Sequence, residues 1–253
     1  MIPIIQDLWI AAMLLAALLV ALEAGFRFGR RTAGKADPHS VGQVGAIQGA
    51  TLGLLGLLLA FSFAAAGARF LERQDLIVQE ANAIGTASLR ADLLDEPHRS
   101  ALRASLRLYN ERRIQLSGQL RSGLSPEAAA EIERMQGRIW AAASAGVAAK
   151  PTSVLAVLSP VNEVIDLHTT RLASGQKHLP ALVMGLLIAC SLIAATVIGY
   201  SCGMGGNRHA PLTVPLAILI GTALWITIDL DHPRAGLIQL SDAPLEALKF
   251  EVP

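Results

Sequence analysis

Residues suited to ion conduction recur at helical spacing in the first third of the chain. On a helical wheel they share one side, and they are Gln48, Thr51, Leu55, Leu58, Ser62, Arg69 and Arg73. A mildly polar lane on an apolar helix is typical of a water-lined pathway, and arginines at its mouth favour anions. Leucines within the lane would form a hydrophobic constriction that gates by dewetting. The pattern therefore predicts a pore-lining helix.

The same lane is also compatible with a helix that only packs. Thr51 and Ser62 can hydrogen-bond to their own backbone. Arg69 and Arg73 can lie at the membrane interface with their charged ends in water. Both interpretations remain open from the sequence.

Carboxylates and imidazoles occur close together at two places. Asp229, Asp231 and His232 end the last apolar segment, and Asp166 and His168 lie further upstream. Such groups can bind a metal ion, but positions i, i+2 and i+3 converge poorly on a helix. We therefore expect an interfacial turn with a capping aspartate, and no metal or cofactor.

Four apolar segments must position these residues, at about residues 4–26, 41–67, 179–204 and 212–228. About 20 apolar residues suffice for a helix to cross a membrane. The predicted fold class is an all-α integral membrane protein with four transmembrane helices. The predicted domains are residues 1–68 with spans one and two, 69–178 as a helical extramembrane insert, 179–230 with spans three and four, and 231–253 as a C-terminal tail.

The insert shows helix signals throughout. Asp95 followed by Pro97 opens a helix to about residue 117, and Ser125 followed by Pro126 opens another to about residue 149. Upstream of both, Asn82, Thr86 and Arg90 recur at i+4 and form a polar strip. A helix–helix seam explains this strip better than a ligand site.

A stripe of small residues faces away from the pore-lining lane. Its members recur every three or four residues, and they are Gly42, Gly45, Gly49, Gly53, Gly56, Ala60, Ala64 and Gly67. Small residues on a membrane helix let another backbone approach closely. The stripe therefore predicts a helix-packing surface.

Five stretches resemble the bestrophin-like domain family of bacterial membrane proteins. They are residues 23–31 (EAGFRFGRR), 43–50 (QVGAIQGA), 56–63 (GLLLAFSF), 80–94 (EANAIGTASLRADLL) and 229–238 (DLDHPRAGLI). The resemblance implies a remote relation to bestrophins, which are oligomeric anion channels whose second span lines the pore. It thus implies a homo-oligomer with a possible ion-channel role. The aromatic neck and the acidic calcium clasp of bestrophins have no counterpart in the residues of this lane or tail.

The alternative function is a non-conducting membrane scaffold or sensor whose helical insert binds a partner or signal. The sequence contains no nucleotide-binding, hydrolase or metalloprotease motif that would indicate an enzyme. A net charge of +1 argues against nucleic acid as a partner. The expected partners are the lipid bilayer, other copies of the chain and possible inorganic ions.

Membrane orientation depends on the short loops. The first carries Arg27, Arg30 and Arg31, and the last carries Arg208, which places both loops in the cytoplasm. The insert would then be periplasmic in a bacterial inner membrane. The family resemblance implies the opposite side, because bestrophins keep their large domain in the cytoplasm.

Overall fold

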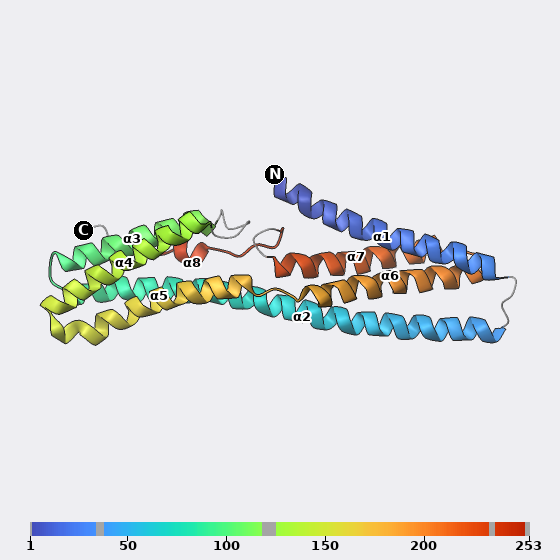
Figure 1. Ribbon diagram of the computed structural model, residues 1–253, viewed down its shortest axis with the longest axis horizontal. Helices are drawn as coiled ribbons and strands as arrows, with labels where there is room; N and C mark the ends of the chain where they lie inside the picture. The colour runs from blue at the N-terminus through green and yellow to red at the C-terminus, as the bar shows by residue number, and fades with distance from the viewer. Residues whose placement is uncertain (1, 34–37, 118–124, 233–235, 251–253) are drawn as a thin grey trace. The chain divides into compact units, whose positions relative to one another are not determined.

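The computed structural model describes residues 2–33, 38–117, 125–232 and 236–250. The chain is all-α over these residues, which contain no strand. The α-helices are α1 (Ile2–Thr32), α2 (Pro38–Arg90), α3 (His98–Ser117), α4 (Pro126–Ala149), α5 (Val154–Gln176), α6 (Ala181–Met204), α7 (Ala210–Asp231) and α8 (Ala243–Glu246), and two short 3-10 turns are η2 (Ala91–Leu93) and η4 (Pro151–Ser153) (Figure 1).

The chain divides into two compact units. The first contains Met1–Ala68 and His178–Ile238, and the second contains Arg69–Lys177 and Gln239–Pro253. Helix α2 therefore contributes its first part to one unit and its second part to the other. The residues from Gln239 onward belong to the second unit, which their sequence pattern did not predict.

The first unit is built from α1, the first part of α2, α6 and α7. Its core consists of buried aliphatic side chains from all four helices, including Leu18, Leu55, Leu187 and Leu224. Helix α1 packs most extensively against α6, and it also contacts α7. Among the described residues, four stretches are long and apolar enough to cross a membrane: Leu8–Thr32, Gly42–Leu93, Pro151–Met204 and Ala210–Asp231. This chain is accordingly a membrane protein with four candidate spanning segments.

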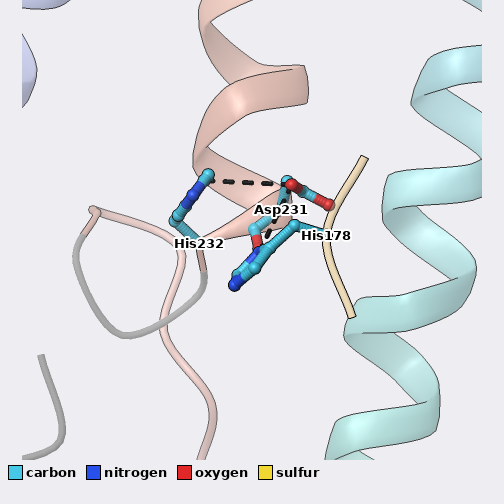
Figure 2. A group of neighbouring side chains, drawn as sticks. All are labelled: His178, Asp231 and His232. Carbon is cyan, nitrogen blue, oxygen red and sulfur yellow. Dashed lines mark hydrogen bonds and ion pairs between the residues drawn. The ribbon is translucent and has the colours of Figure 1, made fainter. Parts of the chain in front are cut away.

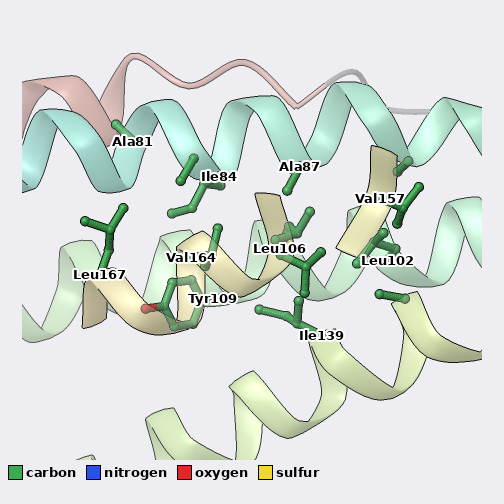
Figure 3. Packing of buried hydrophobic residues seen from close by; sticks show 14 of the residues in the cluster. Ala81, Ile84, Ala87, Leu102, Leu106, Tyr109, Ile139, Val157, Val164 and Leu167 are labelled. Atoms are coloured by element: carbon green, nitrogen blue, oxygen red, sulfur yellow. The ribbon is translucent and has the colours of Figure 1, made fainter. Parts of the chain in front are cut away.

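The second unit packs the second part of α2 with α3, α4 and α5. Figure 3 shows the interlocking side chains of its core, such as Ile84, Leu106, Ile139 and Val164. Leu245 of α8 is also fully buried in this core. The short C-terminal helix is thus part of the second unit's packing.

Local sequence signals set several helix ends. Ser125 is the N-cap of α4, where its Oγ accepts a hydrogen bond from the Ala128 N–H at 3.2 Å, and Pro126 follows in the first turn. The prediction of this helix is confirmed from start to end. Residues 236–240 form no strand. Asp229 instead accepts hydrogen bonds from the Leu237 and Ile238 N–H groups.

Candidate functional site: the covered and open faces of α2

One face of α2 is covered within the first unit. Leu55 is 2% exposed and belongs to the core of that unit, with Leu58 packed at its edge. Ser62 is also buried, and Gln48 and Thr51 are half-buried. Leu55 and Ser62 are thus enclosed within the protomer, so a pathway between copies would have to run along other side chains of α2.

Thr51 illustrates how the polar residues of this face are satisfied. Its hydroxyl donates a hydrogen bond to the Ile47 carbonyl, with an oxygen–oxygen distance of 2.7 Å. Ser191 and Thr227 make the same i−4 bond on α6 and α7. This is the ordinary way in which hydroxyl side chains are accommodated on apolar helices.

The opposite face of α2 is open within the protomer. A methyl group built at Gly42, Gly45, Gly49, Gly53, Gly56 or Gly67 would meet nothing within 4 Å. Ala60 and Ala64 are exposed as well. No neighbour closes this stripe within the described residues, so the predicted packing contact is not made among them.

Close glycine packing does occur, but between α1 and α6. A Cβ atom at Gly25 would overlap the Thr196 carbonyl oxygen, and one at Gly199 would overlap the Leu22 carbonyl oxygen. Gly29 and Gly203 continue the same contact one turn further along each helix. Two G-x-x-x-G motifs therefore face each other, which is a known basis of close helix packing in membranes. Both motifs are present in the sequence, but the helix-packing surface was predicted on the longer stripe of α2.

The second part of α2 also has a covered face, and it holds a buried ion cluster. The Glu80 carboxylate is fully buried and accepts hydrogen bonds from the Tyr109 hydroxyl at 2.9 Å and from Arg113 Nε at 2.9 Å. Arg171 forms a further ion pair with the same carboxylate. Burial raises the pKa of Tyr109, so its hydroxyl remains a donor.

Arg73 lies on this covered face too. It is buried, and it donates to the Ser174 carbonyl at 3.2 Å and to the Lys177 carbonyl at 2.5 Å. These bonds stabilise the C-terminal end of α5, because helix ends leave carbonyl groups without intrahelical partners. Arg69 is half-buried. The role that the structure assigns to Arg73 is structural.

The predicted polar strip does not converge on one point. Asn82 and Arg90 are exposed, Thr86 is half-buried, and Arg90 donates to the Ala156 carbonyl at 3.1 Å. The last contact joins α2 to α5 within the second unit. It is a helix–helix contact of the kind that the sequence favoured.

Exposed apolar side chains continue along α2 in the second unit. Leu71, Val78 and Leu89 are 62%, 38% and 72% exposed. Their spacings of 7 and 11 residues are close to whole turns, so they share one side of α2. We use the name open face of α2 for the stripe from Gly42 to Gly67 in the first unit and for the exposed side with Leu71, Val78 and Leu89 in the second unit.

The comparisons with known proteins identify the family. A family model described as Bestrophin-like domain matches residues 10–245. The chain belongs to this bestrophin-like family. No curated protein and no solved structure matches the chain. The match spans all four candidate membrane segments and most of the second unit, so both faces of α2 belong to the bestrophin-like domain.

The aspartates at the end of α7 in this bestrophin-like chain are buried and hydrogen-bonded. Asp229 accepts from the Leu237 N–H at 3.0 Å and the Ile238 N–H at 2.8 Å. Asp231 accepts from the Leu179 N–H through both carboxylate oxygens. Each carboxylate therefore fixes a chain turn. The sequence could not show that His178, 53 residues upstream, lies beside Asp231 and His232 (Figure 2).

Proposed function

We propose that this chain forms a homo-oligomeric ion channel in the bacterial inner membrane, with the open face of α2 turned toward neighbouring copies. The observation that carries the proposal is that the small-residue half of this face is unoccupied within the protomer. Family membership supports a channel role, because bestrophin-like proteins are associated with channels rather than enzymes.

Contact with lipid alone does not account for the small residues on the apolar half of α2. Six glycines without a Cβ neighbour gain nothing from lipid, and each of them lowers helix stability relative to alanine. Glycines are favoured at positions where the backbone of another helix packs closely against them. In a homo-oligomer, this backbone would belong to a second copy of the chain.

The second part of α2 supports the same partner. In this proposal it belongs to the extramembrane insert, because Glu72, Arg73, Asp75 and Glu80 follow one another there. Leu71 and Leu89 would then be exposed to water unless a protein covers them. Contacts along the whole open face would bury both the small residues and these leucines.

The pathway itself is proposed to run along side chains that flank the open face. Leu57 and Phe61 are 53% and 67% exposed and lie one turn apart on α2. They replace Leu55 as candidates for a hydrophobic constriction, because Leu55 is covered within its own chain. Gln48, Thr51, Leu58 and Arg69 remain candidates where the assembly leaves them accessible.

Orientation is proposed from the short loops. Arg27, Arg31 and Arg208 lie at one end of the first unit's helices, and Glu23 pairs with both Arg27 and Arg208 there. Excess arginine in short loops places that end in the cytoplasm and the second unit in the periplasm.

Purified full-length protein reconstituted into planar bilayers tests the conducting role. The proposal expects single-channel currents from wild type and from Gly185→Leu, whose site on α6 has open space around it. It expects no currents from Gly49→Leu, because a bulky side chain would separate the copies. An oligomer that assembles but carries no current under varied voltage, pH and ion composition would contradict the channel and favour the scaffold or sensor.

A further inference from the structure

We propose that His178, Asp231 and His232 form a binding site for a divalent transition-metal ion of the zinc class. The three residues come from two distant parts of the sequence within the first unit. His178 lies two residues before Pro180, the N-cap of α6, while Asp231 and His232 are the last residue and the C-cap of α7. Figure 2 shows both imidazole rings beside Asp231 at the end of α7.

The potential ligand atoms of the three residues already lie close together. One potential ligand atom from each of the three residues lies within 4.8 Å of the other two. The Nδ1 atoms of His178 and His232 lie 3.4 and 4.0 Å from Asp231 Oδ2. Zinc–nitrogen bonds of about 2.0–2.1 Å put neighbouring ligands of a tetrahedral ion about 3.4 Å apart. A contraction of about 1.4 Å or less would therefore complete a three-ligand site.

The carboxylate is held in place without an ion. Asp231 is 1% exposed, and its two oxygens accept from the Leu179 N–H at 3.1 and 3.0 Å. Such hydrogen bonds to a ligating carboxylate are the usual outer support of a metal site. Asp231 also supplies the negative charge that favours a cation.

Both imidazoles are held near Asp231 by hydrogen bonds through the same Nδ1 atoms. His178 Nδ1 lies 3.0 Å from the Asp231 carbonyl oxygen, and His232 Nδ1 lies 3.2 Å from the Ile228 carbonyl oxygen. A carbonyl oxygen only accepts, so without an ion each Nδ1 carries the proton, and binding a metal through Nδ1 would release that proton and replace the hydrogen bond.

Both histidine side chains are exposed, so an ion can reach them and their rings can reorient. The His178 and His232 side chains are 41% and 51% exposed, and their rings stack with centroids 4.6 Å apart. Rotations of these side chains can turn the Nδ1 lone pairs toward an ion at Asp231 while the buried carboxylate stays fixed. Two imidazoles and one carboxylate are a donor set that zinc and related ions accept, with water completing the coordination.

A metal at this place would link the start of α6 to the end of α7. The alternative is a hydrogen-bonded turn in which the histidines only stack. That alternative predicts no stoichiometric metal binding, although stability could still vary with pH. The metal proposal does not depend on whether the chain conducts ions.

Cobalt and zinc titration of the full-length protein in detergent, after chelator treatment, tests the proposal. We expect one equivalent of Co²⁺ to produce visible d–d absorption, and Zn²⁺ to displace it and raise Tm. Loss of a group that only hydrogen-bonds to a metal ligand weakens metal binding by roughly 10–100-fold. His178→Ala and His232→Ala each remove a ligand, so each should weaken binding by more than this. The control His209→Asn alters an exposed loop histidine and should bind as wild type does.

Two results would overturn the site. One is a wild-type protein that binds neither ion with one-to-one stoichiometry, which needs no variant to interpret. The other is unchanged cobalt absorption and zinc affinity in both alanine variants, with size-exclusion profiles equal to wild type.

Discussion

Glycines occur in two kinds of helix surface in this protein. Between α1 and α6, Gly25 and Gly199 are in direct contact with the partner helix backbone, and no Cβ atom fits there. On α2, Gly49 and Gly53 are spaced in the same way, and nothing lies near them. Residue type and spacing alone therefore do not tell whether a row of glycines is packed within the chain or left open. The difference shows that the α1–α6 contact belongs to the packing of the protomer, and we propose that the open face of α2 is filled on assembly.

The largest effect is expected at the contact within the chain. Gly199→Leu should prevent the α1–α6 packing, because the new side chain would overlap the Leu22 carbonyl. We expect little folded protein, measured by thermal unfolding and size exclusion in detergent. Gly185→Leu on the same helix has open space and is the matched control. Equal Tm values for the two variants would show that the α1–α6 contact is not tight in solution.

The covered face of α2 should be the next most sensitive. Glu80→Gln leaves Arg113 and Arg171 without a carboxylate in the core of the second unit. Removing one partner of a buried ion pair costs about 3–5 kcal/mol, and we expect a corresponding loss of unfolding free energy. The control Glu133→Gln changes an exposed glutamate on α4. A loss below about 1 kcal/mol for Glu80→Gln would mean that the cluster is accessible to water.

Substitution on the open face should separate assembly from folding. Gly49→Leu should leave protomer stability nearly unchanged, because the structure has space for the side chain. It should lower the oligomer fraction measured by native mass spectrometry, because packed backbones would be forced apart. Normal assembly of this variant would indicate that the stripe faces lipid.

The smallest effect is expected at the far end of the open face. Leu89→Lys should weaken assembly without changing Tm by more than a few degrees, because Leu89 is 72% exposed in the protomer. Leu155→Lys on α5 is the control, with an even more exposed leucine on another helix. Equal oligomer fractions for both variants would confine the contact to the apolar half of α2.

The sequence predicts the helices well because their signals are local. The Ser125–Pro126 cap and the four apolar segments depend on neighbouring residues, and the corresponding helices are present. The wheel around α2 also separates small from large residues correctly. Which side of the wheel is covered depends on α1, α6 and α7, which are distant in sequence, so the lane containing Leu55 was expected to be accessible.

The side-chain clusters were harder to predict for the same reason. Glu80 has no unusual neighbours in the sequence, and it becomes buried because α3 and α5 bring Arg113 and Arg171 to it. His178 is 53 residues from Asp231, so spacing along the chain does not show that these two side chains meet. Both cases depend on tertiary contacts that spacing along one helix does not reveal.

A structure of the assembled oligomer in lipid nanodiscs, determined by electron cryo-microscopy, tests the central claim most directly. The proposal predicts that Gly49 and Gly53 lie in van der Waals contact with a neighbouring copy, and that Leu71 and Leu89 are covered by the same neighbour. An assembled or monomeric protein in which Gly49 and Gly53 face lipid would contradict it.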